Sequence, residues 1–396
     1  MKFAHLADCH LGSWREPKLR MANTEAFVSV IERCLSEQVN FVLLSGDLFN
    51  TAVPGIDSLR VAVEQFKRLH DADIPLYFIA GSHDFSPSGK TMLDILEHAG
   101  LGVNVAKGEE LPDNRIKLHF TLDKSGAKIV GLIGKKAGLE SSYYKLLSRD
   151  NLESESGFKI FLFHSALAEL KPKDLSEMDA LAVSLLPAGF DYYAGGHVHV
   201  VDNAAIGKYK NIVFPGPVFP NSFSELEKLK QGSFVLYNDG NIQHIPLQIH
   251  PVVCISVNAE NKSLSEVETE IRRLPNVNNA IVTIRVSGTL KTGRPADLRW
   301  NDVFHDVFAK GAFVVLKNTN AFSSKELEVI MVKEANVEEV EDSLLQQHSA
   351  QFKEFDVELA KKLMLVLSAE KAEGERVADF ESRVHSELDG LLQYLN

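Results

Sequence analysis

Five short polar clusters, each directly after an apolar run, constrain the fold of this chain more than any other feature. They are Asp8-Cys9-His10, Gly46-Asp47, Gly81-Ser82-His83-Asp84, Phe163-His164-Ser165 and Gly195-Gly196-His197-Val198-His199. The apolar runs have the length of buried strands. If these runs are neighbouring strands of one sheet, the carboxylates and imidazoles of the clusters converge where the strands end. Ligands of open α/β sheets bind at such strand ends.

The first 250 residues alternate strand-like segments with helix-like segments. Strands are expected at residues 3–7, 41–44, 76–80, 129–133, 160–163 and 192–194. Two apolar stripes with steps of three and four residues predict helices between the early strands. The stripes are Phe27, Val30, Ile31 and Cys34, and then Leu59, Ala62, Val63, Phe66 and Leu69. This alternation predicts an α/β fold in which helices cover both faces of a sheet.

The pattern changes near residue 251, where a smaller α+β domain is expected to begin. Its expected strands lie at residues 252–257, 280–286, 313–316 and 328–332. A helix carrying Leu264, Val267, Ile271 and Leu274 is expected between the first two of these strands. No strand signal follows residue 336, and apolar residues at helical spacing predict helices at 357–367 and 377–395. The expected division is therefore 1–250, 251–336 and a helical segment at 337–396.

The net charge of −12 is unevenly distributed, because residues 337–396 alone carry −8. This acidity argues against a broad basic surface for non-specific DNA binding. It still allows contact with a phosphodiester through metals and a few local cations. The three cysteines are widely spaced and predict no disulfide framework. The apolar stretches are too short to cross a bilayer, and the opening residues have the pattern of a core strand rather than a signal peptide. We expect a cytoplasmic protein without membrane association.

The polar clusters contain the oxygen and nitrogen donors that a pair of divalent metals needs. Alternation within a strand predicts that Asp8 and His10 point to the same face, and likewise His197 and His199. Asp47, directly after an apolar run, is placed to bridge two ions. The chain contains neither the G-x-S-x-G elbow of acyl-transfer enzymes nor a P-loop. The residues therefore favour a two-metal hydrolase.

The order of the motifs, D-x-H, G-D, G-x-H-D, H and G-H-x-H, resembles that of the calcineurin-like metallophosphoesterases. The segments MKFAHLADCHLG, LLSGDLFN and GGHVH are most similar to the meiotic-recombination-eleven nucleases, whose bacterial relatives are called SbcD. The resemblance is dense over residues 1–220. It implies an α/β fold in which a two-sheet sandwich is flanked by helices, with an α+β capping domain and C-terminal helices.

The resemblance also implies a ligand set for two ions, which are manganese rather than magnesium. The first ion would be held by Asp8, His10, Asp47 and His199, and the second by Asp47, Ser82, His164 and His197. His83 would serve as the catalytic residue that donates a proton to the leaving oxygen. Asp84 either orients the ring of His83 or is an ordinary turn residue. The family usually has Asn at position 82, so the shorter Ser82 hydroxyl would bind the second ion more weakly or through a water.

By the same resemblance, the chain would be a manganese-dependent DNA nuclease with 3′-to-5′ double-strand exonuclease and single-strand endonuclease activities. It would process DNA ends in double-strand-break repair, at the nucleoid, with an SMC-like coiled-coil ATPase that binds the C-terminal helices. A homodimer is also expected. Two alternatives stay open: a calcineurin-like phosphatase or small-molecule phosphodiesterase, and a catalytically weak scaffold at DNA ends, which Ser82 motivates.

Residues that would contact DNA are harder to find from the sequence. Arg15, Lys18 and Arg20, expected in the loop after the first cluster, are candidates for gripping phosphates. Further candidates in the second domain are Arg272, Arg273, Lys291, Arg294 and Arg299. An ordinary solvated surface explains each of these cations equally well.

Overall fold

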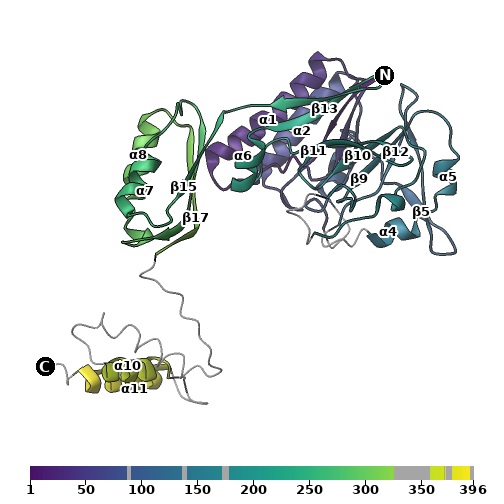
Figure 1. Cartoon of the computed structure of the whole chain (residues 1–396). Helices are drawn as coiled ribbons and strands as arrows, with labels where there is room; N and C mark the ends of the chain where they lie inside the picture. The colour runs from purple at the N-terminus through teal and green to yellow at the C-terminus, as the bar shows by residue number, and fades with distance from the viewer. Residues whose placement is uncertain are drawn as a thin grey trace. The chain divides into compact units, whose positions relative to one another are not determined.

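The structure is a computed structural model that describes residues 1–86, 91–135, 141–171, 178–324, 357–369, 371 and 377–392. It divides into two units, Met1–Ser323 and Ser324–Asn396, which are described separately (Figure 1). None of the helices within these described ranges is long and apolar enough to cross a membrane.

The first sheet has six strands in the order β14-β13-β1-β2-β3-β4. Their bounds are β1 (Lys2–Leu6), β2 (Phe41–Ser45), β3 (Leu76–Ile79), β4 (Val103–Asn104), β13 (Gly232–Asn238) and β14 (Asn241–Leu247). The strands β1 to β4 run parallel, and β13 pairs with β1 in the antiparallel direction. The predicted strands at 3–7, 41–44 and 76–80 are confirmed to within one residue at each end.

The second sheet also has six strands, in the order β11-β12-β10-β9-β8-β7. Their bounds are β7 (Thr121–Leu122), β8 (Lys128–Gly131), β9 (Lys159–His164), β10 (Tyr192–Gly196), β11 (Val201–Ile206) and β12 (Tyr209–Pro215). The central strands β8, β9, β10 and β12 are parallel. A separate two-stranded sheet pairs β5 (Gly108–Glu110) with β6 (Ile116–Leu118).

The two large sheets pack face to face through a buried aromatic layer. Phe3 of the first sheet stacks on Phe41 at 5.0 Å between ring centroids and meets Tyr192 of the second sheet edge-on at 5.1 Å. Phe41, Tyr192 and the other side chains of this layer are fully or almost fully buried. The sandwich implied by the resemblance is therefore confirmed. The expectation of one sheet covered on both faces by helices is wrong, because a strand buried by a second sheet has the same apolar pattern as one buried by a helix.

Helices cover the outer faces of this sandwich. On the first sheet lie α1 (Pro17–Ser36) and α2 (Ile56–Asp71), whose apolar faces share one core with β1 and β2 (Figure 1). The start of α1 is set by a proline in its first turn and by the Glu16 side chain, which accepts a hydrogen bond from the N–H of Lys18. The shorter helices and helical turns are α3 (Met92–His98), α4 (Ser141–Leu146), α5 (Asp150–Glu153), η3 (Val183–Leu185) and α6 (Phe223–Leu229).

A third layer follows, which we call the β15–β17 layer (residues 252–324). Its sheet contains β15 (Val252–Asn258), β16 (Ile281–Leu290) and β17 (Val314–Ser324), covered by α7 (Leu264–Ile271), η4 (Pro295–Asp297) and α8 (Trp300–Ala309). These elements bury a hydrophobic core of their own. The expected strands at 252–257 and 280–286 and the helix between them are confirmed, whereas α8 was not expected. The expected strand at 328–332 lies outside the described residues, and the domain boundaries at 250 and 336 stay predictions.

The second unit contains α10 (Val357–Leu367) and α11 (Val377–Leu392), which contact each other. Both helices were expected from the apolar spacing. The last residues of the expected 377–395 helix lie outside the described residues.

Candidate metal centre

All eight residues that were expected to hold metals or to serve catalysis lie together where the strands of the two large sheets end. Asp8 and His10 follow β1, Asp47 follows β2, Ser82 and His83 follow β3, His164 ends β9, and His197 and His199 follow β10. The cluster contains three sets of potential metal ligands, and within each set the ligand atoms lie within 4.8 Å of one another. The sets are Asp8, His10 and His199; His10, Asp47 and His83; and Asp47, His164 and His197. The convergence is as expected, but two facing sheets produce it rather than neighbouring strands of one.

At five of these eight residues the backbone has a positive φ rather than an extended conformation. The φ angles are 53° at Asp8, 43° at His10, 54° at Asp47, 94° at His197 and 51° at His199. Asp8 and His10 lie together as predicted, but strand alternation is the wrong reason, because neither residue is extended. Each such residue costs about 1–3 kcal/mol and persists only where the surroundings enforce it. Here the loops enforce it on each other, because the N–H of Asp8 donates to Gly46 O and that of His10 donates to Asp47 O.

Glycines allow the ends of these strands to approach closely. A Cβ at Gly46, whose φ is +86°, would lie 2.4 Å from Nδ1 of His164. A Cβ at Gly196 would lie 2.3 Å from the carbonyl oxygen of Ser45. The glycines thus bring the two sheets together around His164.

The first group of ligand atoms surrounds a point between two imidazoles. His10 Nε2 and His199 Nε2 are 3.0 Å apart. Asp8 Oδ1 lies 3.7 Å from His199 Nε2, and Asp47 Oδ2 lies 3.7 Å from His10 Nε2. Asp8, His10 and Asp47 are almost fully buried. Two ring nitrogens and two carboxylates facing one another in a buried space match the donor set of a divalent transition metal.

The second group is built around His164 and shares Asp47 with the first. His164 Nδ1 donates a hydrogen bond to the carbonyl oxygen of Ser45 at 2.7 Å, so Nε2 is the nitrogen left to bind a metal once its proton is displaced. Nε2 lies 3.1 Å from Asp47 Oδ2 but makes no well-aligned hydrogen bond there. The ring of His197 is 5.1 Å from that of His164. A buried nitrogen aimed at a carboxylate without a proper bond fits a ligand whose partner is a cation.

Ser82 lies in the cluster, and its hydroxyl is 3.3 Å from Asp47 Oδ2, to which it donates. The hydroxyl is therefore directed at the carboxylate that the two groups share. This position is compatible with either direct ligation or a water-mediated contact.

The carboxylates and imidazoles of the cluster shift one another's pKa values. Burial alone would raise the pKa of Asp47, but the nearby His164 brings this pKa well below its usual range. Burial would likewise lower the pKa of His164, yet Asp47 outweighs it and raises this pKa to about 10. Asp8 acts against burial in the same way and raises the pKa of His199 to about 9. A metal that binds here must therefore displace protons from these imidazoles.

His83 lies at the edge of the cluster, with its ring 4.7 Å from that of His10. Its Nδ1 is 2.7 Å from the carbonyl oxygen of Asn50, and its backbone N–H donates to Asp47 Oδ1 at 2.7 Å. The Asn50 carbonyl therefore orients the ring, and sequence reasoning missed it because a main-chain acceptor carries no residue signal.

Asp84 does not orient His83. Its carboxylate accepts hydrogen bonds from the N–H groups of Leu48, Phe49 and Gly81 at 3.0–3.2 Å. These bonds tie the loop after β2 to the loop after β3. Of the two roles expected for Asp84, the structure shows that of a turn residue.

Glu225 is a second residue that the sequence analysis missed. It lies in the first turn of α6, and its Oε1 is 3.1 Å from Nδ1 of His199. No helix was expected between residues 194 and 251, where α6 lies. The Ser222-x-x-Glu225 pattern, which is typical of a helix start, was the signal that could have found α6.

A cavity of about 500 Å³ opens above the cluster. It is lined by His10, Asp47, Ser82, His83, His197 and His199 on one side and by Asn221, Ser222, Ser224, Glu225, Lys228 and Leu229 of the α6 region on the other, with Met178, Val198 and Val200 completing it. The cluster is therefore reachable by a substrate, and α6 forms one wall of the approach.

The cations that were candidates for DNA contact near the cluster have contacts within the chain. Lys18 and Arg20 lie in the first turn of α1, not in the expected loop. Lys18 Nζ donates to the carbonyl oxygen of Phe313 at 2.9 Å, and Arg20 Nε donates to that of Trp14 at 2.9 Å. All three candidates, Arg15 included, are exposed, and their contact with DNA stays a prediction.

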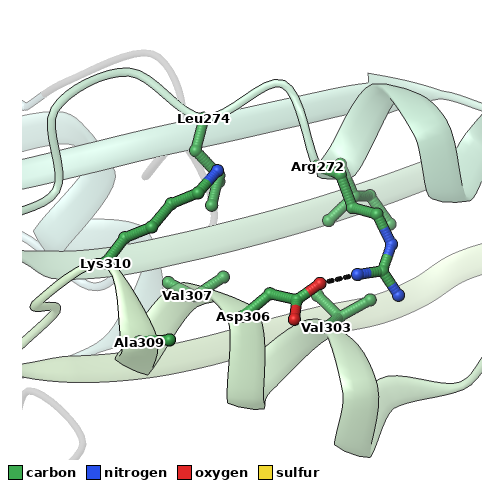
Figure 2. A pocket seen from close by; sticks show the side chains of 8 residues that line it. Arg272, Leu274, Val303, Asp306, Val307, Ala309 and Lys310 are labelled. Atoms are coloured by element: carbon green, nitrogen blue, oxygen red, sulfur yellow. Dashed lines mark ion pairs between the residues drawn. The ribbon is translucent and has the colours of Figure 1, made fainter.

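The candidate arginines of the β15–β17 layer are largely neutralised. Figure 2 shows a pocket of about 230 Å³ between α7 and α8, where Arg272 forms an ion pair with Asp306. Arg272 also pairs with Glu268 at 2.8 Å. The two other paired arginines are Arg294, with Asp297 at 3.2 Å, and Arg299, with Asp302 at 3.3 Å. This pocket has no cluster of potential metal ligands among the described residues, so the chemistry belongs to the other site.

Comparisons with known proteins agree with this site. The model of the calcineurin-like phosphoesterase family matches residues 1–201, a span that contains every residue of the cluster except Glu225. A DNA double-strand break repair protein Mre11 from Archaeoglobus fulgidus is 25% identical over 384 residues, which covers 95% of this chain and 82% of that protein. Another Mre11, from Methanocaldococcus jannaschii, is 26% identical and covers 70% of this chain and 74% of that protein. An uncharacterized metallophosphoesterase of Bacillus subtilis, YhaO, is 26% identical over 54% of this chain and 52% of its own length.

Proposed function

Because this chain belongs to the calcineurin-like phosphoesterase family, we propose that it is a nuclease that hydrolyses phosphodiester bonds of DNA with two divalent ions. The observation that carries the proposal is the buried cluster in which two groups of ligand atoms share Asp47. Relatives described as DNA double-strand break repair proteins support DNA as the substrate, and the alignment to one of them covers 95% of the chain.

In this proposal the first ion is held by Asp8, His10, Asp47 and His199, and the second by Asp47, Ser82, His164 and His197. The donor set, which mixes imidazole nitrogen with carboxylate oxygen, supports divalent transition metals, and the resemblance of the motifs supports manganese among them. When bound, the two ions polarise the phosphate and make hydroxide available at neutral pH. Asp47 keeps both groups in one geometry. His83, which faces the same cavity, donates the proton to the leaving oxygen.

We propose 3′-to-5′ exonuclease activity on duplex ends and endonuclease activity on single strands, used in double-strand-break repair at the nucleoid. The resemblance of the motifs supports these activities. The test is to incubate the protein with manganese and end-labelled duplex, with parallel reactions on a cyclic nucleotide and on nitrophenyl phosphate. Cleavage of the duplex from its ends is expected. Turnover of the small substrates alone would instead identify a phosphatase or small-molecule phosphodiesterase, and DNA binding without any turnover would identify a scaffold.

The C-terminal helices are proposed to bind a coiled-coil ATPase of the SMC-like type. Large apolar side chains on α10 support this, because Leu365 and Leu367 are 74% and 67% exposed. An amphipathic helix that offers such a face is suited to a groove between partner helices. A homodimer is proposed as well, on the resemblance of the motifs alone.

A further inference from the structure

Glu225 makes a contact that the proposed metal chemistry does not itself require. Its Oε1 lies 3.1 Å from Nδ1 of His199, and its Oε2 accepts a hydrogen bond from the N–H of Asn221 at 2.8 Å. Both oxygens are therefore held. The side chain of Glu225 is only 24% exposed, and that of His199 only 19%. This carboxylate is fixed in place before any ion arrives.

The contact determines which nitrogen of His199 faces the ligand group. A proton on Nδ1 that is donated to Glu225 leaves the lone pair on Nε2, and Nε2 is the atom that faces Asp8 and His10. Without Glu225, the ring is free to place its proton on Nε2 or to rotate. An acceptor for the non-ligating nitrogen is how proteins usually fix the tautomer and orientation of a metal-binding imidazole.

The helix that carries Glu225 is in turn held by the β15–β17 layer. Arg285 of β16 donates to both carboxylate oxygens of Glu227: its Nε lies 3.2 Å from Oε1 and 3.0 Å from Oε2, and its terminal nitrogen lies 2.6 Å from Oε2. The same guanidinium lies over the ring of Phe223, 5.1 Å from its centroid. A two-point ion pair of this kind fixes orientation as well as distance.

The chain segment before α6 is also anchored near the cluster. The indole N–H of Trp14, four residues after His10, donates to the carbonyl oxygen of Pro220 at 2.9 Å. The loop that presents His10 and the helix that presents Glu225 are thus tied to each other. α6 is held on one side by the first sheet and on the other by the β15–β17 layer.

We infer that Glu225 is a positioning residue for His199 and that Arg285, through α6, sets the position of Glu225. The β15–β17 layer thereby controls how tightly the first ion is held, although none of its residues belongs to a set of potential ligands or lines the cavity above the cluster. This inference rests on the proposed two-metal function.

The test is a calorimetric titration of the full chain with manganese. Glu225→Ala removes the acceptor and is expected to lower the affinity for one of the two ions by about 10–100-fold. This is the usual cost of losing the acceptor behind a metal-binding histidine. Glu225→Gln keeps an acceptor oxygen, so a smaller loss is expected. Glu64→Gln, at an exposed position of α2, is the matched control and should leave both affinities unchanged. Unchanged affinities in both Glu225 variants would overturn the inference.

Arg285→Ala tests the second half of the inference. It is expected to weaken the same ion as Glu225→Ala and to have no added effect when combined with Glu225→Ala, because Arg285 acts only through that residue. Arg285→Lys keeps the charge without the two-point contact and should give an intermediate affinity. Losses that simply add, or a loss that falls on both ions, would mean that Arg285 only stabilises the fold.

These outcomes are separate from those of the proposed function. A parent protein that binds two manganese ions but leaves DNA intact contradicts the nuclease and not the role of Glu225. Full nuclease activity with unchanged metal affinity in Glu225→Ala contradicts the role of Glu225 and not the nuclease. A parent that binds fewer than two ions overturns both.

Discussion

At the scale of single residues, the proposed function assigns metal binding to Asp47 and proton donation to His83. Asp47 is nearly fully buried and belongs to two of the three sets of potential ligand atoms. His83 belongs to one set, lines the cavity and has its Nδ1 held by the carbonyl oxygen of Asn50. This arrangement leaves the Nε2 side of His83 for the substrate. His83 and Asp47 should therefore fail in different ways when they are replaced.

For His83, we expect His83→Gln to keep both manganese ions and to lose turnover by about 10²–10⁴-fold, the usual contribution of a general acid. Calorimetry gives the number of ions, and cleavage of end-labelled duplex gives the turnover. His70→Gln, at an exposed position of α2, is the control. Binding of fewer ions by His83→Gln would show that His83 is a ligand instead.

For Ser82, we expect Ser82→Asn to tighten the second ion, because an amide oxygen reaches farther toward the metal than the hydroxyl now directed at Asp47. Cleavage at limiting manganese should rise with the tighter binding. The measurement is a manganese titration of the parent and the variant. Equal affinities would mean that the serine, or a water it holds, is already an adequate ligand.

At the scale of helices and strands, the predicted strands that lead into the polar clusters are present, because long buried apolar runs are a strong local signal. Their packing into two sheets had no such signal. The strands β11 and β14 were missed because their exposed and intermediate positions interrupt the apolar pattern. The strands β12 and β13 were also missed, although most of their residues are buried. The left-handed residues at the cluster also contradict simple alternation, as is common where backbone strain is kept for function.

One buried histidine joins the two sheets behind the cluster. His5 of β1 is fully buried, and its ring nitrogens lie 3.0 Å from the hydroxyls of Tyr192 on β10 and Ser45 on β2. Burial, reinforced by the nearby His244, lowers the pKa of His5 from 6.5 to about 3. The carbonyl of the same Ser45 orients His164, so this contact lies directly behind the second ligand group.

The lowered pKa predicts how stability depends on pH. Between pH 6.5 and 3 the unfolded chain binds a proton at His5 that the folded chain excludes, so this contribution is complete above pH 6.5 and is lost as the pH falls. Through this one group, the free energy of unfolding falls by up to about 1.4 kcal/mol for each pH unit in that range. Urea unfolding with a chelator at pH 7 and pH 5 should show a smaller pH difference for His5→Gln than for the parent. An unchanged difference, equal to that of the exposed control His119→Gln, would contradict this account.

At the scale of the whole molecule, the chain has a catalytic sandwich with an added layer, and a second unit whose described residues form two helices. The acidic character of residues 337–396 and the exposed apolar side chains of α10 fit partner binding better than a part in catalysis. No contact between this unit and the metal cluster enters the proposed chemistry. Partner binding and DNA cleavage should therefore be separable.

A chain ending at Asn336 is expected to keep metal-dependent cleavage of short substrates and to lose binding to the coiled-coil ATPase. Cleavage assays and co-purification with the genomic coiled-coil neighbour measure the two properties. Full binding of the ATPase by the shortened chain would place the interface elsewhere. Loss of folding, detected by circular dichroism, would show that these helices are part of the core.

The central claim is that Asp47 bridges two ions in one hydrolytic site. Calorimetric titration of the parent and of Asp47→Ala with manganese, with Asp57→Ala at an exposed position as the control, tests it most directly. We predict two ions for the parent and for the control. For Asp47→Ala we predict the loss of both ions, together with the loss of DNA cleavage. Two ions bound with unchanged affinity in Asp47→Ala, or a parent that cleaves DNA with a chelator present, would contradict the account.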